Sequence, residues 1–285
     1  MGKRLMGAVI GDISGSWYEF SKYKGRPEKL ILSRDRFTDD TVLTVAVGHG
    51  MVRAFRKVSR AGLAGDEAAQ KTVRAEVTES LWRFAMRYPK AGYGRTFIKW
   101  FHDAAAGLGA EPYNSWGNGS AMRASFPGWA ADSLEDALLL AKLSAEVTHN
   151  HPEGIKGAQA VAAAIYLART GADKAEIRRY LSGFYDLDFT LDEIRPTYKF
   201  EVSCQKSVPQ ALNCFLEAED FEDTIRNAIS LGGDSDTQAA IAGSIAEAFY
   251  PVPEDLEARA WAKLSPMLQN ELDVIDSYLN RQTDG

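Results

Sequence analysis

The sequence lacks the features that mark several large classes of protein. Its 285 residues contain two cysteines, Cys204 and Cys214, which form no CxxC pair and belong to no Cys/His cluster. This argues against a disulfide framework and a cysteine-ligated zinc site, and it predicts two reduced, partly buried thiols. No stretch approaches the ~20 apolar residues of a membrane span. The short apolar run near the start breaks at Gly11-Asp12, too early for a signal-peptide core, so we expect a soluble, cytoplasmic protein.

The chain also lacks any concentration of positive charge. Its net charge is -6, and residues of both signs are spread along its length. Without a basic stripe, direct binding of DNA or RNA is not expected. The acidic balance does not repel metal ions, so a cation site is compatible with the composition.

Strictly alternating runs of β-branched residues, which would indicate strands, are nearly absent. Instead, Ala-rich segments carry apolar residues at three- and four-residue spacing, and 45% of the residues are apolar, which is ample for a continuous core. No linker, low-complexity tract or fixed-period repeat divides the chain, so we predict one all-α domain over 1–285. Prolines, Pro209 among them, fall between the helical segments or at their edges, and 183–203 is expected to be an extended loop. The predicted helices are 40–57, 72–88, 133–147, 154–170, 206–216, 222–230, 236–249 and 254–279.

Two short acidic clusters lie near opposite ends of the chain. Residues 38–41 (TDDT) and 234–237 (DSDT) each place two carboxylates and two hydroxyls within four positions, and each precedes a helical pattern. The simplest interpretation is that each caps a helix, because hydroxyls and acids suit a first turn. The second cluster follows Gly232-Gly233, where the backbone can approach a ligand closely. If the fold joins the two helix starts, their oxygens form a site for hard divalent cations.

Further acids lie in the glycine-rich segment 11–20 (GDISGSWYEF). Asp12 and Glu19 could add a third group of ligands, because paired metal ions ~3.5–4 Å apart need carboxylates that arrive from more than one direction. An acid next to an aromatic residue, as Glu19 is next to Phe20, is more often a surface residue. A role for Glu19 therefore depends on the three segments converging.

A glycine-rich turn and a histidine-containing loop carry the remaining candidates. Segment 114–123 (NSWGNGSAMR) places Gly-Asn-Gly-Ser before an expected short helix, where successive backbone amides form a nest for phosphate oxygens. It lacks the ending of a Walker loop, and an ordinary glycine turn is an equal interpretation. Segment 148–154 (THNHPEG) suits hydrogen bonds to sugar hydroxyls or phosphate better than it suits zinc. Alternatively, its histidines cap the end of the helix at 133–147.

Taken together, these stretches resemble the ADP-ribosylglycohydrolase family. The motifs GDISGSWYEF, FTDDT, GNGSAMR, THNHPEG and GGDSDT occur in the family's order and span residues 7 to about 250. The resemblance implies an all-α orthogonal helical bundle with a binuclear Mg²⁺ or Mn²⁺ centre. It also implies hydrolysis of the glycosidic bond between ADP-ribose and an acceptor, which is an ADP-ribosylated protein side chain or a small molecule. The acceptor, the choice of metal and the oligomeric state stay open.

The resemblance also implies roles for individual residues. Glu19 matches an acid beside the metals and the scissile sugar, and Glu19, Asp39 and Asp236 are the carboxylates that could orient or deprotonate the attacking water. Some members carry a further acid in the region that here reads GYGRTF (92–97), so no arginine-linked specificity follows. His149 matches a histidine that contacts the ribose. The implied metal ligands are Thr38, Asp39, Asp40, Asp234, Asp236 and Thr237, and the implied substrate-binding residues are Gly117, Asn118, Gly119, Ser120, Met122 and His149.

Three alternative functions share these residues. A metal-dependent phosphohydrolase of a nucleotide diphosphate would use the same metals and phosphate nest but would release AMP. A non-catalytic ADP-ribose-binding protein would bind the nucleotide and leave the modified protein intact. A structural helical protein, in which the acidic clusters only cap helices, would bind no metal. The two intact acidic clusters and the glycine turn favour the glycohydrolase.

Overall fold

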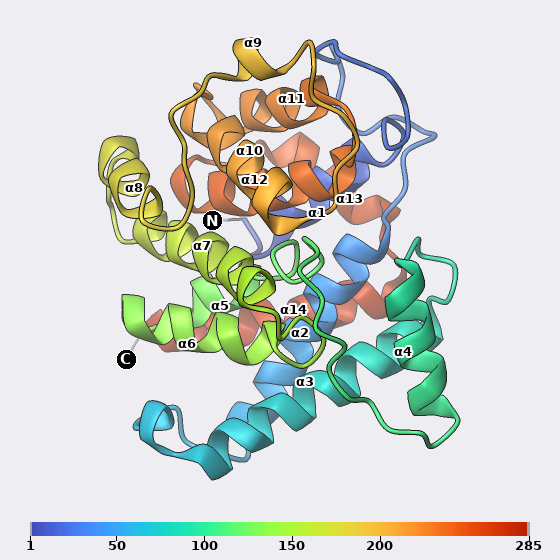
Figure 1. Cartoon of the computed structure of the whole chain (residues 1–285), viewed down its shortest axis with the longest axis vertical. Helices are drawn as coiled ribbons and strands as arrows, with labels where there is room; N and C mark the ends of the chain where they lie inside the picture. The colour runs from blue at the N-terminus through green and yellow to red at the C-terminus, as the bar shows by residue number, and fades with distance from the viewer. Residues whose placement is uncertain (1, 284–285) are drawn as a thin grey trace.

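The structure, a computed structural model, describes residues 2–283 and is built from helices (Figure 1). Among these residues there is no β-strand, only an isolated bridge between Gly117 and Ser203. The predicted all-α fold is therefore confirmed, and the helices cross in several directions (Figure 1). In chain order they are α1 (Met6–Gly15), α2 (Asp39–Phe55), α3 (Glu67–Arg87), α4 (Arg95–Ala105), α5 (Ser125–Ala130), α6 (Leu134–Ala145), α7 (Pro152–Arg169), α8 (Lys174–Leu181), α9 (Leu191–Ile194), α10 (Cys204–Leu216), α11 (Phe221–Leu231), α12 (Ser235–Phe249), α13 (Glu254–Lys263) and α14 (Pro266–Thr283).

Most helices lie where the apolar spacing predicts them. The first seven predicted segments match α2, α3, α6, α7, α10, α11 and α12, although α3 begins earlier, at Glu67. The eighth, 254–279, is divided into α13 and α14 because Pro266 cannot donate a backbone hydrogen bond and instead begins the second helix. Helices α1, α4 and α8 were not predicted. The region 183–203 is largely irregular, as expected, apart from the single turn of α9.

Pro209 corrects one expectation about the prolines. It lies inside α10 and not at an edge of a helical segment. Its ring removes the backbone hydrogen bond to the carbonyl of Gln205. Because Pro209 is buried among core residues, packing offsets that loss, and the helix continues through it.

Helices α1 and α12 lie antiparallel with their backbones in contact. A Cβ placed on Gly11 would lie 2.0 Å from the carbonyl oxygen of Ala239, and one placed on Gly7 would lie 2.2 Å from that of Gly243. Only glycine permits so close an approach. Every residue of α1 is buried, and so are residues 235–246 of α12. This contact brings the end of α1, which carries Asp12, to the start of α12.

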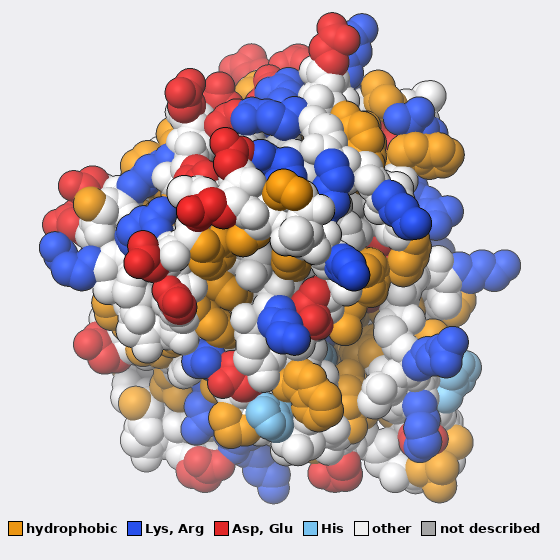
Figure 2. Space-filling model, turned by 45° about the horizontal axis from the view of Figure 1, so that its top comes forward, with side chains coloured by type: hydrophobic (Ala, Val, Ile, Leu, Met, Phe, Trp, Pro, Cys, Tyr) orange, Lys and Arg blue, Asp and Glu red, His pale blue; other side chains and the backbone are white. Residues whose placement is uncertain are grey.

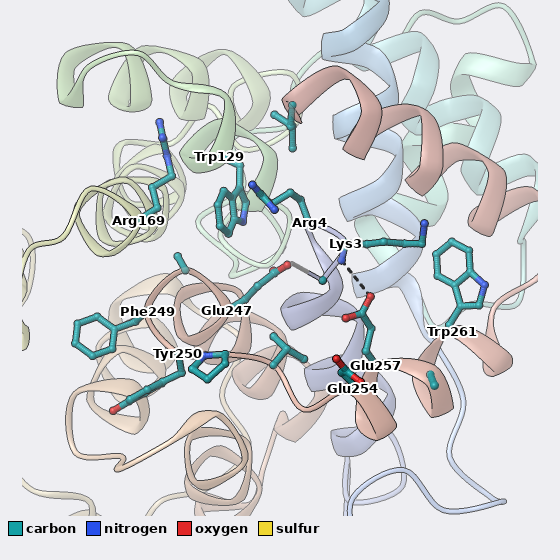
Figure 3. Close-up of a pocket in the computed structure, with 16 residues that line it drawn as sticks. Lys3, Arg4, Trp129, Arg169, Glu247, Phe249, Tyr250, Glu254, Glu257 and Trp261 are labelled. Atoms are coloured by element: carbon teal, nitrogen blue, oxygen red, sulfur yellow. Dashed lines mark hydrogen bonds between the residues drawn. The ribbon is translucent and has the colours of Figure 1, made fainter. Parts of the chain in front are cut away.

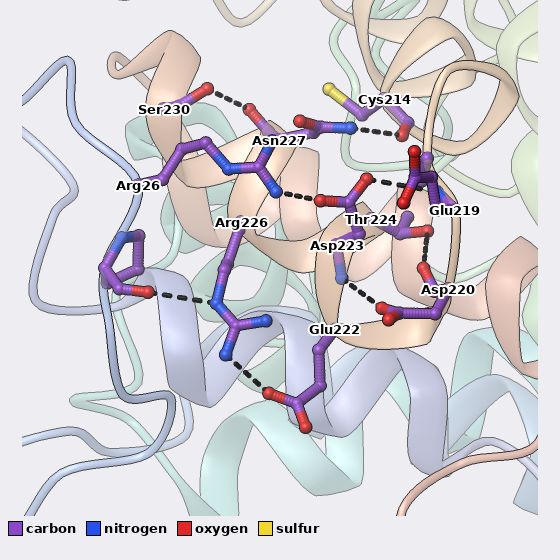
Figure 4. Close-up of polar contacts among 12 residues, drawn as sticks. Arg26, Cys214, Glu219, Asp220, Glu222, Asp223, Thr224, Arg226, Asn227 and Ser230 are labelled. Carbon is purple, nitrogen blue, oxygen red and sulfur yellow. Dashed lines mark hydrogen bonds and ion pairs between the residues drawn. The ribbon is translucent and has the colours of Figure 1, made fainter.

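The segment that joins Glu19 to the start of α2 is attached to helix α11 (Figure 4). Asp220 caps that helix by accepting a hydrogen bond of 2.7 Å from the amide of Asp223. The Asp223 side chain pairs with Arg26, and Arg226 donates to the carbonyl of Pro27 at 3.0 Å. A capped and therefore firmly ordered helix start thus fixes the path of the segment between two parts of the candidate site.

The cysteines are free thiols, and they are buried more completely than the partly buried thiols that the sequence predicted. Cys204 and Cys214 are both free, as predicted, and both are fully buried. Within residues 2–283, no helix combines the length and the apolar character that crossing a membrane requires.

Candidate active site

Asp12 is the anchor that joins the start of α2 to α1. Its buried carboxylate accepts hydrogen bonds from the Thr38 amide at 2.8 Å, the Thr38 hydroxyl at 2.7 Å and the Thr41 amide at 3.0 Å. The Thr41 hydroxyl donates to it as well. The Asp12 carboxylate therefore satisfies two backbone amides at the start of α2 that have no partner within the helix, so α1 supplies a cap from outside the helix. Thr38 is also the N-cap residue itself, and its hydroxyl accepts from the amide of Asp40 at 3.4 Å.

The acidic residues from three segments converge in two overlapping groups. One carboxylate oxygen each from Asp12, Asp40 and Asp236 lie within 4.8 Å of one another, and the same holds for Glu19, Asp234 and Asp236. Asp236 belongs to both groups. The first-turn cluster of α2 and the first-turn cluster of α12 therefore meet, as the sequence indicated they could, and Asp236 lies between two potential cation positions.

The carboxylates of these two groups are destabilised as anions unless a positive charge lies near them. Burial raises the pKa of Asp40 and Asp236 well above the usual range, and the neighbouring carboxylates raise both pKa values further. Burial also raises the pKa of Asp12 and Asp234, against the effect of the hydrogen bonds that each accepts. Oxygen Oδ1 of Asp40 is buried without a hydrogen-bond donor. Carboxylates with a free buried oxygen fit a hard divalent cation such as Mg²⁺ or Mn²⁺.

The two threonines of the acidic clusters contact the same carboxylate. The Thr237 hydroxyl donates to Oδ2 of Asp40 at 3.2 Å, and the Thr38 hydroxyl, whose proton goes to Asp12, lies 3.2 Å from the same oxygen. Asp40 therefore accepts a hydrogen bond through Oδ2 and leaves Oδ1 free for a ligand. In this arrangement, Thr38 and Thr237 lie at the acidic groups and orient Asp40.

Glu19 and Asp39 differ from the other acids in their surroundings. Glu19 lies in the turns that follow α1 and is half-buried, and burial, followed by the charge of Asp234, raises its pKa to about 7. Burial, and then the charge of Asp12, raise the pKa of Asp39 well above its usual range, but Asp39 belongs to neither group. Its Oδ1 instead faces the backbone of Gly92, where a Cβ would lie 3.2 Å away.

The glycine turn at 117–120 borders the acidic groups through Asn118. Its side-chain amide donates to Oδ2 of Asp234 at 2.7 Å, which explains why Asp234 precedes α12 without capping it. The backbone amide of Asn118 donates to the Val202 carbonyl at 2.8 Å, and the backbone amide of Gly117 donates to the Ser115 hydroxyl at 3.1 Å. Two of the four amides expected to form a phosphate nest are thus already bonded within the protein.

Downstream of this turn, the structure differs from the expectation of a helix that follows directly. A further turn separates it from α5, which begins at Ser125. The hydroxyl of Ser120 donates to the carbonyl of Gly154 at 2.6 Å, and Met122 is 4% exposed and packs in the core. Among the described residues, no hydrogen bond occupies the amides of Gly119 and Ser120, so these two remain for an oxyanion.

His149 points at the glycine turn and is held by a chain of two hydrogen bonds. The buried guanidinium of Arg123 donates to the Thr148 hydroxyl at 2.7 Å, and that hydroxyl lies 2.8 Å from Nδ1 of His149. Because arginine only donates, the hydroxyl proton is free to be donated to Nδ1. Burial and the Arg123 charge hold the pKa of His149 well below its usual value. A neutral ring that accepts at Nδ1 carries its proton on Nε2, which lies 3.2 Å from where a Cβ on Gly119 would be.

Arg123 and Thr148 were not predicted as functional residues. Both lie inside motifs that the sequence analysis singled out, and Arg123 is fully buried with Nε and Nη1 unbonded. A charged residue in an otherwise apolar segment was the available signal. His151 lies in the same motif but caps α7, because its Nδ1 accepts from the amide of Glu153 at 3.1 Å. The alternative that the histidines cap the preceding helix is wrong for His151.

Exposed aromatic side chains belong to the segments that form the acidic groups and the glycine turn. Phe20 is 76% exposed and stacks on Phe200, with ring centroids 5.1 Å apart. Trp17 and Trp116 are more than half exposed. The face drawn in Figure 2 shows apolar side chains between interspersed acidic and basic ones, and no continuous basic stripe. These four aromatics, here called the aromatic rim, are available to contact a large partner.

Residues 3–281 match the family model described as ADP-ribosylglycohydrolase. The chain belongs to the ADP-ribosylglycohydrolase family. It is accordingly a hydrolase that acts on the glycosidic linkage of ADP-ribose. The resemblance read from the five motifs is confirmed by a match that extends well beyond them.

Individual members of this family align along nearly the whole chain. ADP-ribosylhydrolase ARH3 of Homo sapiens is 26% identical, with 97% of this chain and 92% of that protein covered. ADP-ribosylarginine hydrolase Tri1 of Pseudomonas putida (strain GB-1) is 29% identical over 94% of this chain and 76% of that protein. ADP-ribosyl-[dinitrogen reductase] glycohydrolase of Rhodospirillum rubrum is 25% identical over 94% and 91%. A solved ADP-ribosylglycohydrolase-related protein complex shares the fold, with a TM-score of 0.70, 23% identity and coverage of 97% and 95%.

Proposed function

We propose that this ADP-ribosylglycohydrolase uses two divalent metal ions, Mg²⁺ or Mn²⁺, held by the two acidic groups that share Asp236. The observation that carries the proposal is the convergence of buried carboxylates from α1, the start of α2 and the start of α12. Asp12, Asp40 and Asp236 would hold one ion, with Thr38 and Thr237 beside it. Glu19, Asp234 and Asp236 would hold the other. The five carboxylates would bring enough negative charge to bind two divalent cations.

The roles within the reaction follow from exposure and bonding. Hydrolysis breaks the bond between the anomeric carbon and the acceptor atom through an oxocarbenium-like state. Bound cations would supply the charge that lowers the pKa of water and fixes the ribose hydroxyls. We assign the proton acceptor to Glu19, because its carboxylate is the one member of the two groups that is only half-buried, so an attacking water can reach it. Asp236 is shared by the two groups, and Asp39 belongs to neither and faces Gly92. We therefore assign the proton acceptor to neither of them.

The remaining residues would bind and orient the substrate. The free amides of Gly119 and Ser120 suit a diphosphate oxygen, and the Nε2 proton of His149 suits a ribose or phosphate oxygen nearby. Gly117 would shape the backbone of the turn, and Asn118 would hold Asp234 through its side-chain hydrogen bond. Met122 acts only by packing behind the turn. Fixing the diphosphate in this way would hold the anomeric carbon at the acidic groups.

We further propose that the acceptor is a protein side chain. The relatives named above are described as acting on ADP-ribosylated arginine or on dinitrogen reductase. The aromatic rim, with Phe20 directly after Glu19, offers contact area that a small acceptor would not need. We also propose that 1–285 acts as one domain and that the protein works in the cytoplasm, where the two buried thiols stay reduced.

The test is incubation with ADP-ribosylated arginine, serine and glutamate proteins and with ADP-ribosyl-arginine, each with EDTA, Mg²⁺ or Mn²⁺, followed by identification of the products. We expect intact ADP-ribose, only with metal, and a higher kcat/KM for a protein substrate. Release of AMP would indicate a phosphohydrolase instead. Substitution of Phe20 or Trp116 by Ala should lower kcat/KM for the protein substrate and not for ADP-ribosyl-arginine. Equal losses on both substrates would refute the proposed protein acceptor.

A further inference from the structure

A pocket lies at the end of α12 that is far from the acidic groups (Figure 3). Glu247, Ala248 and Phe249 of α12 line it, and eleven residues of helix separate Glu247 from Asp236, or about 16 Å. Its volume is about 970 Å³, at the upper end of the range for small-molecule sites. Other walls come from the chain start, α5, α13 and α14. Nothing in the proposed catalytic site involves these residues.

Arg4 is the unusual residue of this pocket. Its side chain is 8% exposed and stacks on Trp129, with the guanidinium carbon 4.7 Å from the ring centroid. Among the described residues, its guanidinium makes no hydrogen bond or ion pair, although the Arg4 amide donates to Asp276 at 3.0 Å. In Figure 3 the guanidinium points across the pocket beside Trp129. The charge of Arg4 acts on the nearby carboxyl of Glu247, but within residues 2–283 the guanidinium has no direct partner, and its fork of five donors suits an oxyanion.

The other cations that line the pocket already have partners. Lys3 pairs with Asp273 at 2.5 Å, and Arg169 donates to the carbonyl of Gly128 at 2.9 Å and to that of Ala131. The nearby Glu247 forms no ion pair with Arg4 and accepts from the Gly7 amide at 3.0 Å. Trp129 contributes its ring, on which Arg4 stacks, while its Nε1 is buried and unbonded. Among the described residues that line this pocket, the cation without a direct partner is therefore Arg4.

The rest of the wall has an apolar part and an acidic part. Phe249, Val252, Trp261 and Leu279 form the apolar part, together with alanine and proline. Glu254 and Glu257 of α13 form the acidic part, and Glu257 accepts a hydrogen bond from the Lys3 amide at 3.0 Å. A ligand whose anionic group paired with the Arg4 guanidinium would place the rest of its surface against the apolar side chains, where burial of apolar area is favourable.

We propose that this pocket binds a small organic anion, whose oxyanion group pairs with the Arg4 guanidinium and whose flat apolar body lies against the Phe249 and Val252 wall. The oxyanion is a carboxylate or a phosphate monoester, since both match the planar fork of arginine. The site is independent of the ADP-ribose site and leaves the acidic groups untouched.

The experiment is a fluorescence titration of the full chain with 8-anilinonaphthalene-1-sulfonate, an aromatic anion, and with N-phenyl-1-naphthylamine, the same body without charge. We expect saturable binding of the anion at one site per chain. Arg4→Met keeps the apolar stem on Trp129 and removes the charge, and it should weaken anion binding about tenfold or more. It should leave binding of the neutral probe within about twofold. Arg281→Met, which removes an exposed cation outside the pocket on α14, is the matched control and should change neither.

Three results would overturn the proposal. They are no saturable anion binding, equal anion affinity in Arg4→Met and Arg281→Met, and displacement of the anion by ADP-ribose. Competition by 1-naphthoate and by 1-naphthyl phosphate then separates the two oxyanions, and displacement by neither would also overturn it. Unchanged anion binding in Asp236→Asn would show that anion binding in this pocket does not depend on the proposed metal centre. A thermal scan confirms that Arg4→Met is folded before its affinity is compared.

Discussion

A carboxylate oxygen of Asp12 lies within 4.8 Å of one of Asp236, although 224 positions separate the two residues. Burial keeps the charges of these carboxylates from being screened by solvent. Without a bound cation, their repulsion destabilises the fold. If the proposed metal ions bind, the same charges provide the affinity, so the acidic groups would oppose stability without metal and support function with it.

Replacement of the shared carboxylate should separate these two effects. Asp236→Asn should raise the thermal midpoint of the EDTA-treated protein by about 2 °C or more, because it removes one of the repelling charges. It should also abolish the increase in midpoint that Mg²⁺ or Mn²⁺ causes, and lower kcat at least about 100-fold. Scanning calorimetry with and without metal measures the first two effects. Asp192→Asn, an exposed acid outside both groups, is the control; a metal-induced shift retained in Asp236→Asn would contradict the shared role.

Glu19 should be separable from the metal groups by its effect on chemistry. Glu19→Gln removes the proposed proton acceptor and one ligand, while Asp12, Asp40 and Asp236 remain in place. We expect kcat to fall by a factor of about 100 to 10,000, with part of the metal-induced rise in thermal midpoint retained. Single-turnover kinetics and calorimetry on the same preparation check both. If kcat stays within tenfold of the wild type, another carboxylate takes the proton.

The Arg123–Thr148–His149 chain should determine the tautomer of His149. Thr148→Val removes the hydroxyl between the two residues, whereas Thr148→Ser preserves it. In the wild type and in Thr148→Ser, ¹⁵N chemical shifts should show His149 protonated at Nε2. In Thr148→Val, we expect a mixture of tautomers and an increase in KM of about tenfold, since the lost hydrogen bond contributes ~1 kcal/mol or more. A single Nε2–H tautomer in Thr148→Val would show that Arg123 and Thr148 do not set it.

The contact between α1 and α12 should not accept a single added methyl group. In Gly11→Ala the new Cβ would meet the Ala239 carbonyl at 2.0 Å, so the helices must separate. We expect a loss of about 3 kcal/mol or more in the free energy of unfolding, measured by urea denaturation. Gly65→Ala, where nothing lies within 4 Å of the added Cβ, should change it by less than about 1 kcal/mol. Similar losses in both variants would contradict the close approach.

Glu247 should make stability depend on pH. Burial raises the pKa of this carboxyl to about 8, whereas an unfolded glutamate titrates near ~4.3. Between these values the folded state binds more protons than the unfolded state, so the stabilisation from the protonated form is complete below about pH 4 and is lost as the pH rises through 8. Glu247→Gln keeps an acceptor for the Gly7 amide and cannot ionise. Its stability advantage over the wild type should grow from pH 5 to pH 8.5 by about 1–3 kcal/mol, as measured by denaturant titration at each pH.

Parts of the site were visible in the sequence because they are local. Thr38 and Asp234 precede helical patterns and suit a first turn, and both lie where α2 and α12 begin. The motifs fixed which residue types were available for metal and for phosphate. They did not show that Asp39 would turn toward Gly92, or that Asn118 and Gly117 would use their amides within the protein.

The sequence by itself determined most of the helices, the ligand-type side chains at two helix starts and the family. Those features depend on apolar spacing, capping chemistry and residue identity over a few positions. Only the tertiary structure decided that Asp12 joins the acidic groups and that Asp236 is shared between them. It also left Arg4 without a partner in a separate pocket. These outcomes depend on how closely α1 approaches α12, and on which donors happen to meet each buried group, because contacts between residues far apart in sequence are not encoded in any local pattern.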